Sequence, residues 1–337
     1  MFQCGLYGGS FNPLHLGHVR CIIAAASQCQ RLIVVLSIGD QRDEIDARQR
    51  YRWLYQATSK LDNVNLYVIH DDAASKADYG EASWQADAAL VKAFAGQPID
   101  AVFCGSDYGR DSFWSRCYPE AALVTLPRDG ISSSAIRADP LAHWDWLPPV
   151  VRPYYVRKVL IVGGESTGKS TLTANLANYY NTNFVPEVGR ELSERSGTDQ
   201  LMLPADFTDI LLQHKTGEVE ALKHSNRLLF EDTDCLTTLF YLGFLAGPDQ
   251  APNAALAEAI AGLNTYDLVL FLEPDVAFVQ DGDRSPVIAT DRERYSDQLK
   301  QIYRRHGLAG HTISGDYDSR FRQAVSLVDK LIQGVER

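Results

Sequence analysis

Gly163-Gly164-Glu165-Ser166-Thr167-Gly168-Lys169-Ser170 is the stretch that most strongly constrains the fold of this 337-residue chain. It matches the pattern Gly-x4-Gly-Lys-Ser of a phosphate-binding loop. In such a loop the glycines let backbone N–H groups point at the phosphates, the lysine holds the β- and γ-phosphates, and the serine hydroxyl binds Mg²⁺. The stretch stands between a predicted strand at Lys158–Val162 and a predicted helix at Ser170–Tyr180, which is the context the motif requires. We therefore predict an ATP·Mg²⁺ site that runs from Gly163 to Thr171.

Short apolar runs alternate with helix-like stretches on both sides of a proline-rich segment at residues 139–157. Such alternation is typical of a parallel sheet with helices on both faces, and the prolines interrupt it because proline cannot continue a helix. We predict two doubly wound α/β domains, at residues 1–148 and 158–337, with a linker at 149–157. A proline-rich loop inside one larger domain is the alternative. The expected strands are Phe2–Tyr7, Arg31–Leu36, Asn65–Ile69, Ala101–Cys104, Ala122–Leu126, Lys158–Val162, Arg227–Phe230 and Leu268–Leu272, and the expected helices are Gly17–Ala26, Ala47–Thr58, Trp84–Phe94, Ser170–Tyr180, Ala205–Lys223 and Asp316–Ile332.

The overall composition excludes several classes of protein. The net charge of −11, from 32 basic and 43 acidic residues, argues against a nucleic-acid-binding surface. It does not exclude nucleotide substrates, because helix N-termini and local cations can bind phosphate on an acidic protein. The sequence has neither a signal peptide nor an apolar run long enough for a membrane span. Six scattered cysteines without a Cys-x-x-Cys spacing indicate free thiols, and we expect a cytoplasmic protein without a membrane partner.

Acidic and basic residues downstream of the loop suit phosphoryl transfer. Asp232 follows an apolar run, where a metal-associated aspartate or a general base would lie. Glu187 follows a short predicted strand, with Arg190 one helical turn on, and is the second candidate for the base. Arg284 and Arg292 belong to a segment that suits a mobile lid. The alternatives are a solvated helix start for Glu187 and an ordinary charged loop for the arginines.

A second candidate phosphate site follows the first predicted strand. Residues 8–18 read Gly-Gly-Ser-Phe-Asn-Pro-Leu-His-Leu-Gly-His. His15 and His18 are three residues apart at a helix start, so both lie on one face and can stabilise charge on a phosphate. A metal site is the rival interpretation, but no convincing third ligand is identifiable. Farther along, Ser132 and Ser133 precede Arg137, which lies on the same helix face as Ser133; such serines more often cap helices.

Together these segments resemble known families. His15-x-Gly17-His18 is similar to the HxGH signature of the nucleotidyltransferase superfamily, and Ile131–Arg137 is similar to its partner motif ISSTxxR. An HxGH domain followed by a P-loop kinase domain resembles the NadR-type bifunctional family of NAD synthesis. Pro186–Glu191, Phe230–Asp232 and Asp281–Arg284 support the second half of that resemblance.

The resemblance implies a Rossmann-like HxGH nucleotidyltransferase followed by a P-loop NTPase-type kinase. The activities it implies are ribosylnicotinamide kinase and nicotinamide mononucleotide (NMN) adenylyltransferase, with ATP, nicotinamide riboside, NMN and NAD as binding partners and Mg²⁺ as cofactor. Asp232, or else Glu187, would deprotonate the riboside, while Lys169 and the lid arginines carry charge; Ser170 and Asp232 would hold the metal. The adenylyltransferase site would comprise His15, His18 and Arg137 as catalytic residues and Gly8, Gly9, Ser10, Phe11, Ser132 and Ser133 for ATP.

The sequence also departs from the NadR type. That type often has a lysine in the first loop, whereas Gly9-Ser10-Phe11 is closer to the nicotinate mononucleotide adenylyltransferases. Asp107, in Cys104-Gly105-Ser106-Asp107, is a second similarity to the nicotinate mononucleotide adenylyltransferases. Trp84 or Trp114 could stack on a pyridine ring or belong to the core. The sequence therefore leaves open whether the acceptor carries nicotinamide, an amide, or nicotinate, an acid. Since the chain begins at the first catalytic strand, we expect no operator-binding helix-turn-helix; a homo-oligomer is compatible with the sequence. The rival hypotheses are other acceptors on the same folds and a nucleotide-sensing regulator without turnover.

Overall fold

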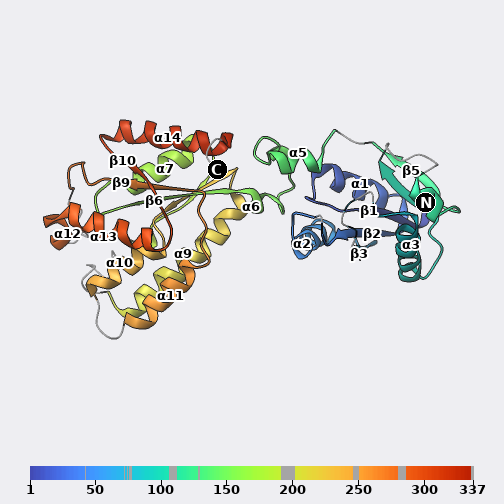
Figure 1. Cartoon of the computed structure of the whole chain (residues 1–337), viewed down its shortest axis with the longest axis horizontal. Helices are drawn as coiled ribbons and strands as arrows, with labels where there is room; N and C mark the ends of the chain where they lie inside the picture. Colours follow the sequence, from blue (N-terminus) through green and yellow to red (C-terminus); the bar gives the residue numbers. More distant parts are fainter. Residues whose placement is uncertain are drawn as a thin grey trace. The chain divides into compact units, whose positions relative to one another are not determined.

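The computed structural model describes residues 1–41, 43–71, 73, 75, 78–105, 112–127, 130–190, 202–245, 250–279 and 286–334. The chain divides into two compact units, Met1–Arg152 and Pro153–Arg337 (Figure 1). The division falls inside helix α6 (Arg152–Tyr155), which occupies part of the segment predicted as a linker. Both units have the α/β architecture that the sequence predicts, with a parallel five-stranded sheet in each.

The N-terminal unit is built on a sheet with the strand order β3-β2-β1-β4-β5. The central strand β1 pairs in parallel with β2 on one side and β4 on the other. Its residues Cys4 and Leu6 are fully buried, because helices cover both faces of a doubly wound sheet. The elements are β1 (Phe2–Gly9), α1 (Leu16–Ala26), β2 (Cys29–Gly39), α2 (Ala47–Thr58), β3 (Val64–Asp71), α3 (Glu81–Ala95), β4 (Ala101–Gly105), α4 (Phe113–Cys117), β5 (Ala122–Leu126), α5 (Ser133–Ala138) and the 3-10 helix η1 (Trp144–Trp146).

The C-terminal unit has the strand order β10-β9-β6-β8-β7. Alternate residues of its central strand β6 enter different cores: Val159 and Ile161 pack with α7 and α14, whereas Leu160 and Val162 pack with α10, α11 and α13. Figure 1 shows these two groups of helices on opposite faces of the sheet. The elements are β6 (Arg157–Gly163), α7 (Lys169–Tyr179), β7 (Asn183–Val185), α9 (Pro204–His224), β8 (Leu228–Asp232), α10 (Cys235–Leu245), α11 (Ala251–Ala261), β9 (Leu268–Leu272), α12 (Pro286–Thr290), α13 (Arg292–Arg305), β10 (His311–Ile313) and α14 (Tyr317–Gln333).

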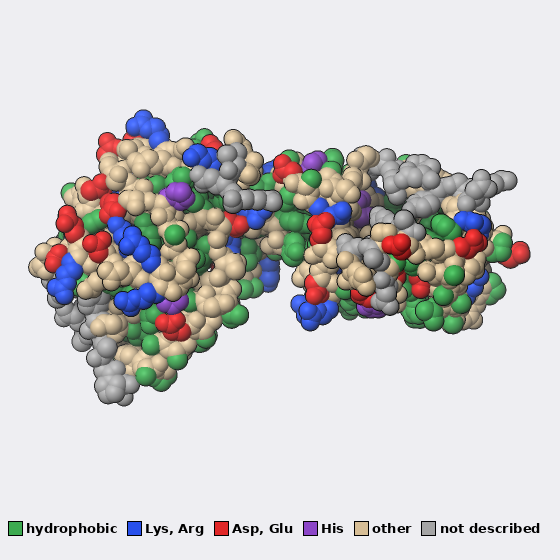
Figure 2. All heavy atoms as spheres, in the orientation of Figure 1, with side chains coloured by type: hydrophobic (Ala, Val, Ile, Leu, Met, Phe, Trp, Pro, Cys, Tyr) green, Lys and Arg blue, Asp and Glu red, His purple; other side chains and the backbone are tan. Residues whose placement is uncertain are grey.

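The predicted strands and helices are confirmed, with small differences at their ends. Strand β8 runs to Asp232, two residues beyond the predicted end at Phe230, so Glu231 and Asp232 are its last residues. Helices α11 and α13 were not predicted as elements, whereas a helix beginning at Cys235 was expected and is α10. Among the described helices none has the length and hydropathy needed to cross a membrane. All six cysteines are free thiols, as expected. Figure 2 shows acidic and basic side chains interspersed on the face of each unit that it presents.

Candidate active sites

The first candidate site lies where β1 ends and α1 begins. His15 is the N-cap residue of α1, and its Nδ1 accepts a hydrogen bond from the backbone N–H of His18 at 3.3 Å. In return, Nδ1 of His18 accepts from the backbone N–H of His15 at 3.4 Å. Because each Nδ1 is an acceptor, the proton of a neutral ring resides on Nε2. Each imidazole can therefore offer an Nε2–H donor to an anion near the helix N-terminus.

The two histidine rings are packed tightly against each other and their surroundings. Their centroids lie 3.6 Å apart with an angle of 16° between the planes. A Cβ on Gly17 would lie 3.1 Å from the His15 ring, so glycine at this position allows the ring to fold back on the helix. Phe11, which is fully buried, meets the His18 ring edge-on at 4.9 Å and also packs on Gly9. The structure thus brings both histidines to one point.

Side chains from two other helices hold the loop before α1 through its carbonyl oxygens. Arg50 of α2 donates to the carbonyl of Ser10 at 2.8 Å. From α5, Ser133 donates to the carbonyl of Pro13 at 3.2 Å, and Arg137 donates to that of Asn12. Ser132, which was expected at the phosphate site, is the N-cap of α5. The residues of the ISSTxxR-like motif and the HxGH-like loop are therefore in direct contact, although they are more than a hundred residues apart in the chain.

Arg50 was not predicted as a site residue. It is 1% exposed, donates to the carbonyl of Ile45 at 3.0 Å, and forms an ion pair with Asp43 at 2.9 Å. The sequence did contain a signal for it: Arg50 lies three and four residues before Trp53 and Leu54, on the apolar face of the predicted helix Ala47–Thr58. A charged residue on a buried helix face needs partners in the fold.

A small cavity of about 20 Å³, lined by aromatic side chains, adjoins this site. The rings of Trp84 and Trp114 lie 5.0 Å apart at 75° in its wall. A Cβ on Gly8 would lie 2.6 Å from the Trp114 ring, so only glycine lets that ring approach the loop. Burial raises the pKa of Asp87, which also lines the cavity and accepts a hydrogen bond from Tyr79. Both tryptophans are thus half-buried beside the loop, where a pyridine ring could reach them; Asp107 lies outside the described residues.

The second candidate site is the phosphate-binding loop between β6 and α7. A Cβ on Gly163 would lie 2.8 Å from Thr167 Oγ1 and 2.9 Å from the carbonyl of Leu272, so the strand can turn there only with glycine. Gly168, at φ +84°, is the N-cap of α7 and lies under the Tyr317 ring. Lys169 is buried, and its ammonium donates to the carbonyl of Gly164 at 3.1 Å.

The remaining loop residues have separate roles in holding its shape. Thr167 Oγ1 donates to the carbonyl of Gly164 at 2.8 Å, and Ser166, at φ +58°, accepts from the backbone N–H of Val279 at 2.8 Å. Glu165 accepts from the Tyr241 hydroxyl at 3.3 Å. Thr171, the last residue predicted for this site, is exposed in the first turn of α7.

Carboxylates gather where β8 ends beside the loop. Asp232 is 1% exposed, and burial followed by the negative charge of Glu187 raises its pKa to about 6. Lys169 and a hydrogen bond from Ser170 oppose that rise. The other carboxylate, Glu187, forms an ion pair with Arg190 at 3.7 Å. All the residues predicted for catalysis in this unit that the structure describes are therefore brought together.

Two arginines, Arg292 and Arg320, contact the loop from neighbouring elements. Arg292 donates to the carbonyl of Ser166 at 3.3 Å and packs on the Phe278 ring. Arg320, which was not predicted, is 1% exposed and donates to the carbonyls of Thr167, Gly315 and Glu273. Arg292 is therefore next to the phosphate site, whereas Arg284 lies outside the described residues.

The donor set fits a divalent metal carried in with ATP. Oδ1 of Asp232 has no hydrogen-bond partner within the described part of the chain, and the Ser170 hydroxyl hydrogen-bonds the same carboxylate. Oxygen ligands of this kind, completed by substrate phosphates and water, suit Mg²⁺. Among the described residues no group of three or more His, Cys, Asp or Glu could hold a metal ion.

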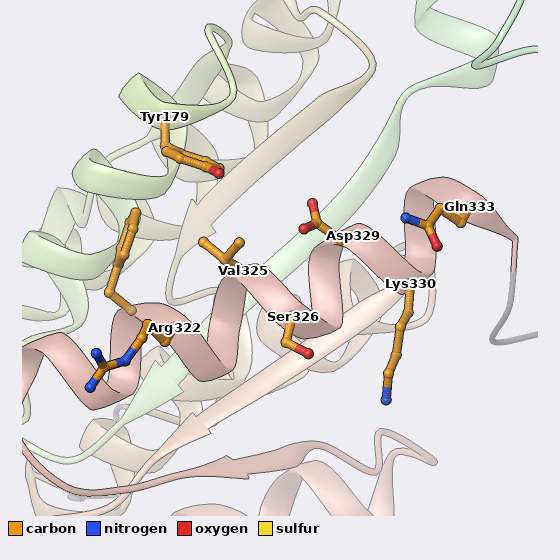
Figure 3. Close-up of a pocket in the computed structure, with 8 residues that line it drawn as sticks. Tyr179, Arg322, Val325, Ser326, Asp329, Lys330 and Gln333 are labelled. Carbon is orange, nitrogen blue, oxygen red and sulfur yellow. The ribbon is translucent and has the colours of Figure 1, made fainter.

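A third hollow, a groove of about 510 Å³ between α7 and α14, is lined by none of these residues. Figure 3 shows Tyr179 of α7 facing Val325 of α14, with Asp329 and Lys330 farther along the same helix.

Comparisons with known proteins match both units. A model described as cytidylyltransferase-like matches residues 6–139, and one described as an AAA domain matches residues 158–320. Two proteins named "Trifunctional NAD biosynthesis/regulator protein NadR", from Salmonella typhimurium and Escherichia coli, are each 29% identical over 344 residues. The alignment covers 97% of this chain and 83% of each relative. Over nearly its whole length the chain is therefore similar to the NadR proteins.

Solved structures agree with this similarity at the level of the fold. A NadR protein in complex with NR matches 99% of the NadR-like chain and 97% of its own length, with a TM-score of 0.83 and 22% identity. A NadR protein with NAD and AMP-PNP covers 100% and 98%, with a TM-score of 0.81 and 20% identity. The NadR-like fold therefore extends over both units of the chain.

Proposed function

We propose that the chain is a bifunctional enzyme of NAD biosynthesis. Its C-terminal unit phosphorylates nicotinamide riboside with ATP, and its N-terminal unit transfers AMP from a second ATP to the resulting NMN, which yields NAD and pyrophosphate. The observation that carries the proposal is the presence in one NadR-like chain of two separate sites with phosphate-binding geometry. One is the pair His15–His18 at the start of α1, and the other is the loop before α7.

In the kinase step the 5′-hydroxyl of the riboside attacks the γ-phosphorus of ATP. The Asp232 carboxylate accepts the hydroxyl proton, since its raised pKa makes it a better base than an exposed aspartate. Lys169, already beside the phosphate-binding loop, carries negative charge that builds on the transferred group. Mg²⁺ bound to ATP would be held by Ser170 and Asp232 and would neutralise phosphate charge. The bond from the γ-phosphorus to the bridging oxygen breaks, and ADP leaves.

In the adenylyl step a phosphate oxygen of NMN attacks the α-phosphorus of ATP. The Nε2–H groups of His15 and His18 donate to the crowded phosphate oxygens, and the α1 N-terminus adds its positive end. Arg137 and Ser133 lie against the same loop and can turn from its carbonyls to the phosphates. The pyridine ring would meet Trp114 and Trp84 in the neighbouring aromatic cavity. No covalent enzyme intermediate is needed, because positioning and charge stabilisation suffice.

The proposal is tested by supplying nicotinamide riboside and ATP with Mg²⁺ and measuring NMN, NAD and pyrophosphate. Lys169→Ala should stop NMN formation but leave the conversion of added NMN to NAD, and His18→Ala should do the reverse. If the folded wild-type protein binds these compounds without releasing ADP or pyrophosphate, a sensing role replaces the enzymatic one. A parallel assay with nicotinate mononucleotide decides between amide and acid acceptors.

A further inference from the structure

Strand β3 forms one edge of the sheet in the N-terminal unit. It is eight residues long, whereas β5 at the other edge has five, and the edge strands of the C-terminal sheet, β7 and β10, have three each. From Val64 to Ile69 it contains no charged residue, proline or glycine. Proteins usually keep a free sheet edge short or interrupt it with such residues, because a long regular edge pairs with other strands. The β3 edge therefore has the features of a strand that is paired.

The hydrogen bonds to β2 identify which backbone groups of β3 face outward. The N–H of Leu32 in β2 donates to the carbonyl of Asn63, directly before β3, so the odd-numbered residues of β3 face β2. Because successive residues of a strand direct these groups to opposite sides, the N–H and C=O groups of Leu66, Val68 and His70 face away from β2. Among the described residues none forms a hydrogen bond with these outward groups. The edge thus offers a row of donors and acceptors to another strand.

Helix α3 adds exposed apolar surface next to this edge. Leu90 is 53% exposed and Phe94 is 38% exposed, and Tyr67 of β3 stacks on the Phe94 ring at 4.5 Å. Figure 2 shows hydrophobic side chains gathered where Figure 1 draws α3. Backbone hydrogen bonds alone contribute little net stability in water, so a strand that binds here also needs apolar area to bury. Leu90, Phe94 and Tyr67 supply that area.

The two ends of the β3 edge carry opposite charge. At its N-terminal end, Arg31 donates to Asn65 Oδ1 at 2.6 Å and to a carbonyl of α3 at 2.6 Å. Both acceptors are neutral, and no carboxylate in the described part of the chain pairs with Arg31. At the C-terminal end lie the carboxylates of Asp71 and Asp40, the latter 3.2 Å from the His70 ring. A second β3 strand in antiparallel orientation would place the acidic end of each strand beside the basic end of the other.

We propose that β3 pairs with β3 of a second copy of this chain, antiparallel about a two-fold axis at Tyr67. The two five-stranded sheets then form one sheet of ten strands. In this register Leu66 of each copy lies opposite Val68 of the partner subunit, and their outward groups exchange hydrogen bonds. The complementary charge pattern favours a second copy of the chain as the occupant of this edge, since the same surface supplies both signs.

The pairing leaves both adenylyl-transfer sites accessible. Each site lies at the carboxyl end of β1, which runs parallel to β3 within the sheet. The strands of the second copy run in the opposite direction, so its site lies at the opposite end of the joint sheet. The inference therefore goes beyond the proposed function and does not depend on it.

The oligomeric state of the full chain tests this edge. Sedimentation equilibrium at micromolar concentration should give twice the chain mass of 37.5 kDa. Val68→Pro removes an outward N–H but no hydrogen bond to β2, and it should raise the dimer dissociation constant at least about 100-fold. Thr125→Pro is the matched control, because the Ala122 N–H faces β4 and the Thr125 N–H therefore faces outward at the β5 edge; it should leave the dimer intact. Arg31→Gln should raise the dissociation constant about tenfold, since two symmetry-related charge pairs are lost.

A cross-link tests the register. Across the axis the Tyr67 residues form a non-hydrogen-bonded pair, whose Cα atoms lie about 4.5 Å apart, within the range for a disulfide. Tyr67→Cys treated with oxidised glutathione should therefore give a disulfide-linked dimer. The six native cysteines are buried free thiols and serve as the background. Tyr55→Cys, at an exposed position of α2, should stay unlinked.

A wild-type monomer would overturn the inference, and so would a dimer whose affinity is unchanged in Val68→Pro. Adenylyl transfer and tryptophan fluorescence show whether each variant is folded. If Val68→Pro does not fold, hydrogen exchange of the wild-type protein decides. The amides of Leu66 and Val68 should become more protected as the protein concentration rises, whereas that of Thr125 should not; protection of Leu66 and Val68 that is independent of concentration would refute the pairing.

Discussion

His15 and His18 stack their imidazole rings at 3.6 Å while the Nδ1 atom of each accepts a backbone N–H from the other residue. One pair of side chains therefore caps helix α1, fixes the tautomer of both rings and orients two Nε2–H donors. These roles are physically linked, because a ring turned to serve one of them loses the others. A substitution that keeps the capping hydrogen bond but removes the Nε2–H donor can therefore separate helix capping from catalysis.

Substituting His15 should separate helix capping from catalysis. His15→Asn keeps a good N-cap side chain but loses the Nε2–H donor, so adenylyl transfer should fall about 10²-fold with little loss of stability. His15→Ala loses the cap as well and should cost about 1 kcal/mol more in the free energy of unfolding. All five tryptophans lie in the Met1–Arg152 unit, so tryptophan fluorescence reports the unfolding of that unit. A His15→Asn variant with wild-type turnover would show that the ring has no catalytic role.

The kinase step should depend on pH through Asp232. Its pKa, raised by burial and by Glu187 to about 6, means that the basic form is lost as pH falls through that value, and kcat should fall with it. Glu187→Gln removes the negative neighbour, so the acidic limb of the kcat profile should move to lower pH. Asp232→Asn should lower kcat at least about 10²-fold at every pH. If Glu187→Gln instead abolishes turnover and Asp232→Asn does not, the base is Glu187.

Glu231 should make the stability of the C-terminal unit depend on pH. Burial, and then the charge of Glu218, raise its pKa from 4.5 to about 8. The folded state thus keeps a proton that the unfolded chain has lost, and the contribution of Glu231 to stability declines as pH rises from about 4.5 to about 8. Glu231→Gln removes this decline, so relative to wild type it should gain on the order of 2 kcal/mol between pH 6 and pH 8.

The measurement for Glu231 is calorimetric unfolding at both pH values, using the transition that tryptophan fluorescence does not follow. Glu220→Gln is the matched control, because Glu220 is an exposed glutamate on α9 whose pKa is lowered by Lys223. Parallel pH curves for wild type and Glu231→Gln would mean that Glu231 is ionised in the folded protein.

Arg320 should be required for the shape of the phosphate-binding loop. Its buried guanidinium joins the carbonyl of Thr167 to those of Gly315 and Glu273 and pairs with Asp275. Arg320→Ala leaves these groups without a donor and should cost about 3 kcal/mol or more in the stability of this unit. Arg320→Lys should fold better but raise the KM for ATP, since lysine cannot donate in as many directions. Adenylyl transfer by the other unit should not change; an unchanged KM in both variants would assign Arg320 a purely structural role.

Much of this organisation could be predicted from the sequence because the signals are local. The buried runs around Leu6 and Leu160 have the length of strands, and the glycine-rich stretches follow them directly. The segment around α11 was missed because it is apolar on nearly all sides, so it lacks the polar face that marks a helix at the surface. The extension of β8 to Asp232 was missed because charged residues rarely end a buried strand without partners.

The sequence by itself determined the two α/β units and the positions of both phosphate-binding segments, since each motif is contiguous and each element is encoded by short-range periodicity. Only the tertiary structure decided which side chains support those segments. Arg50 lies 40 residues from the carbonyl of Ser10, and Arg320 lies 153 residues from that of Thr167. Nothing local encodes such contacts, because buried donors find their acceptors only when strands and helices pack and water is excluded.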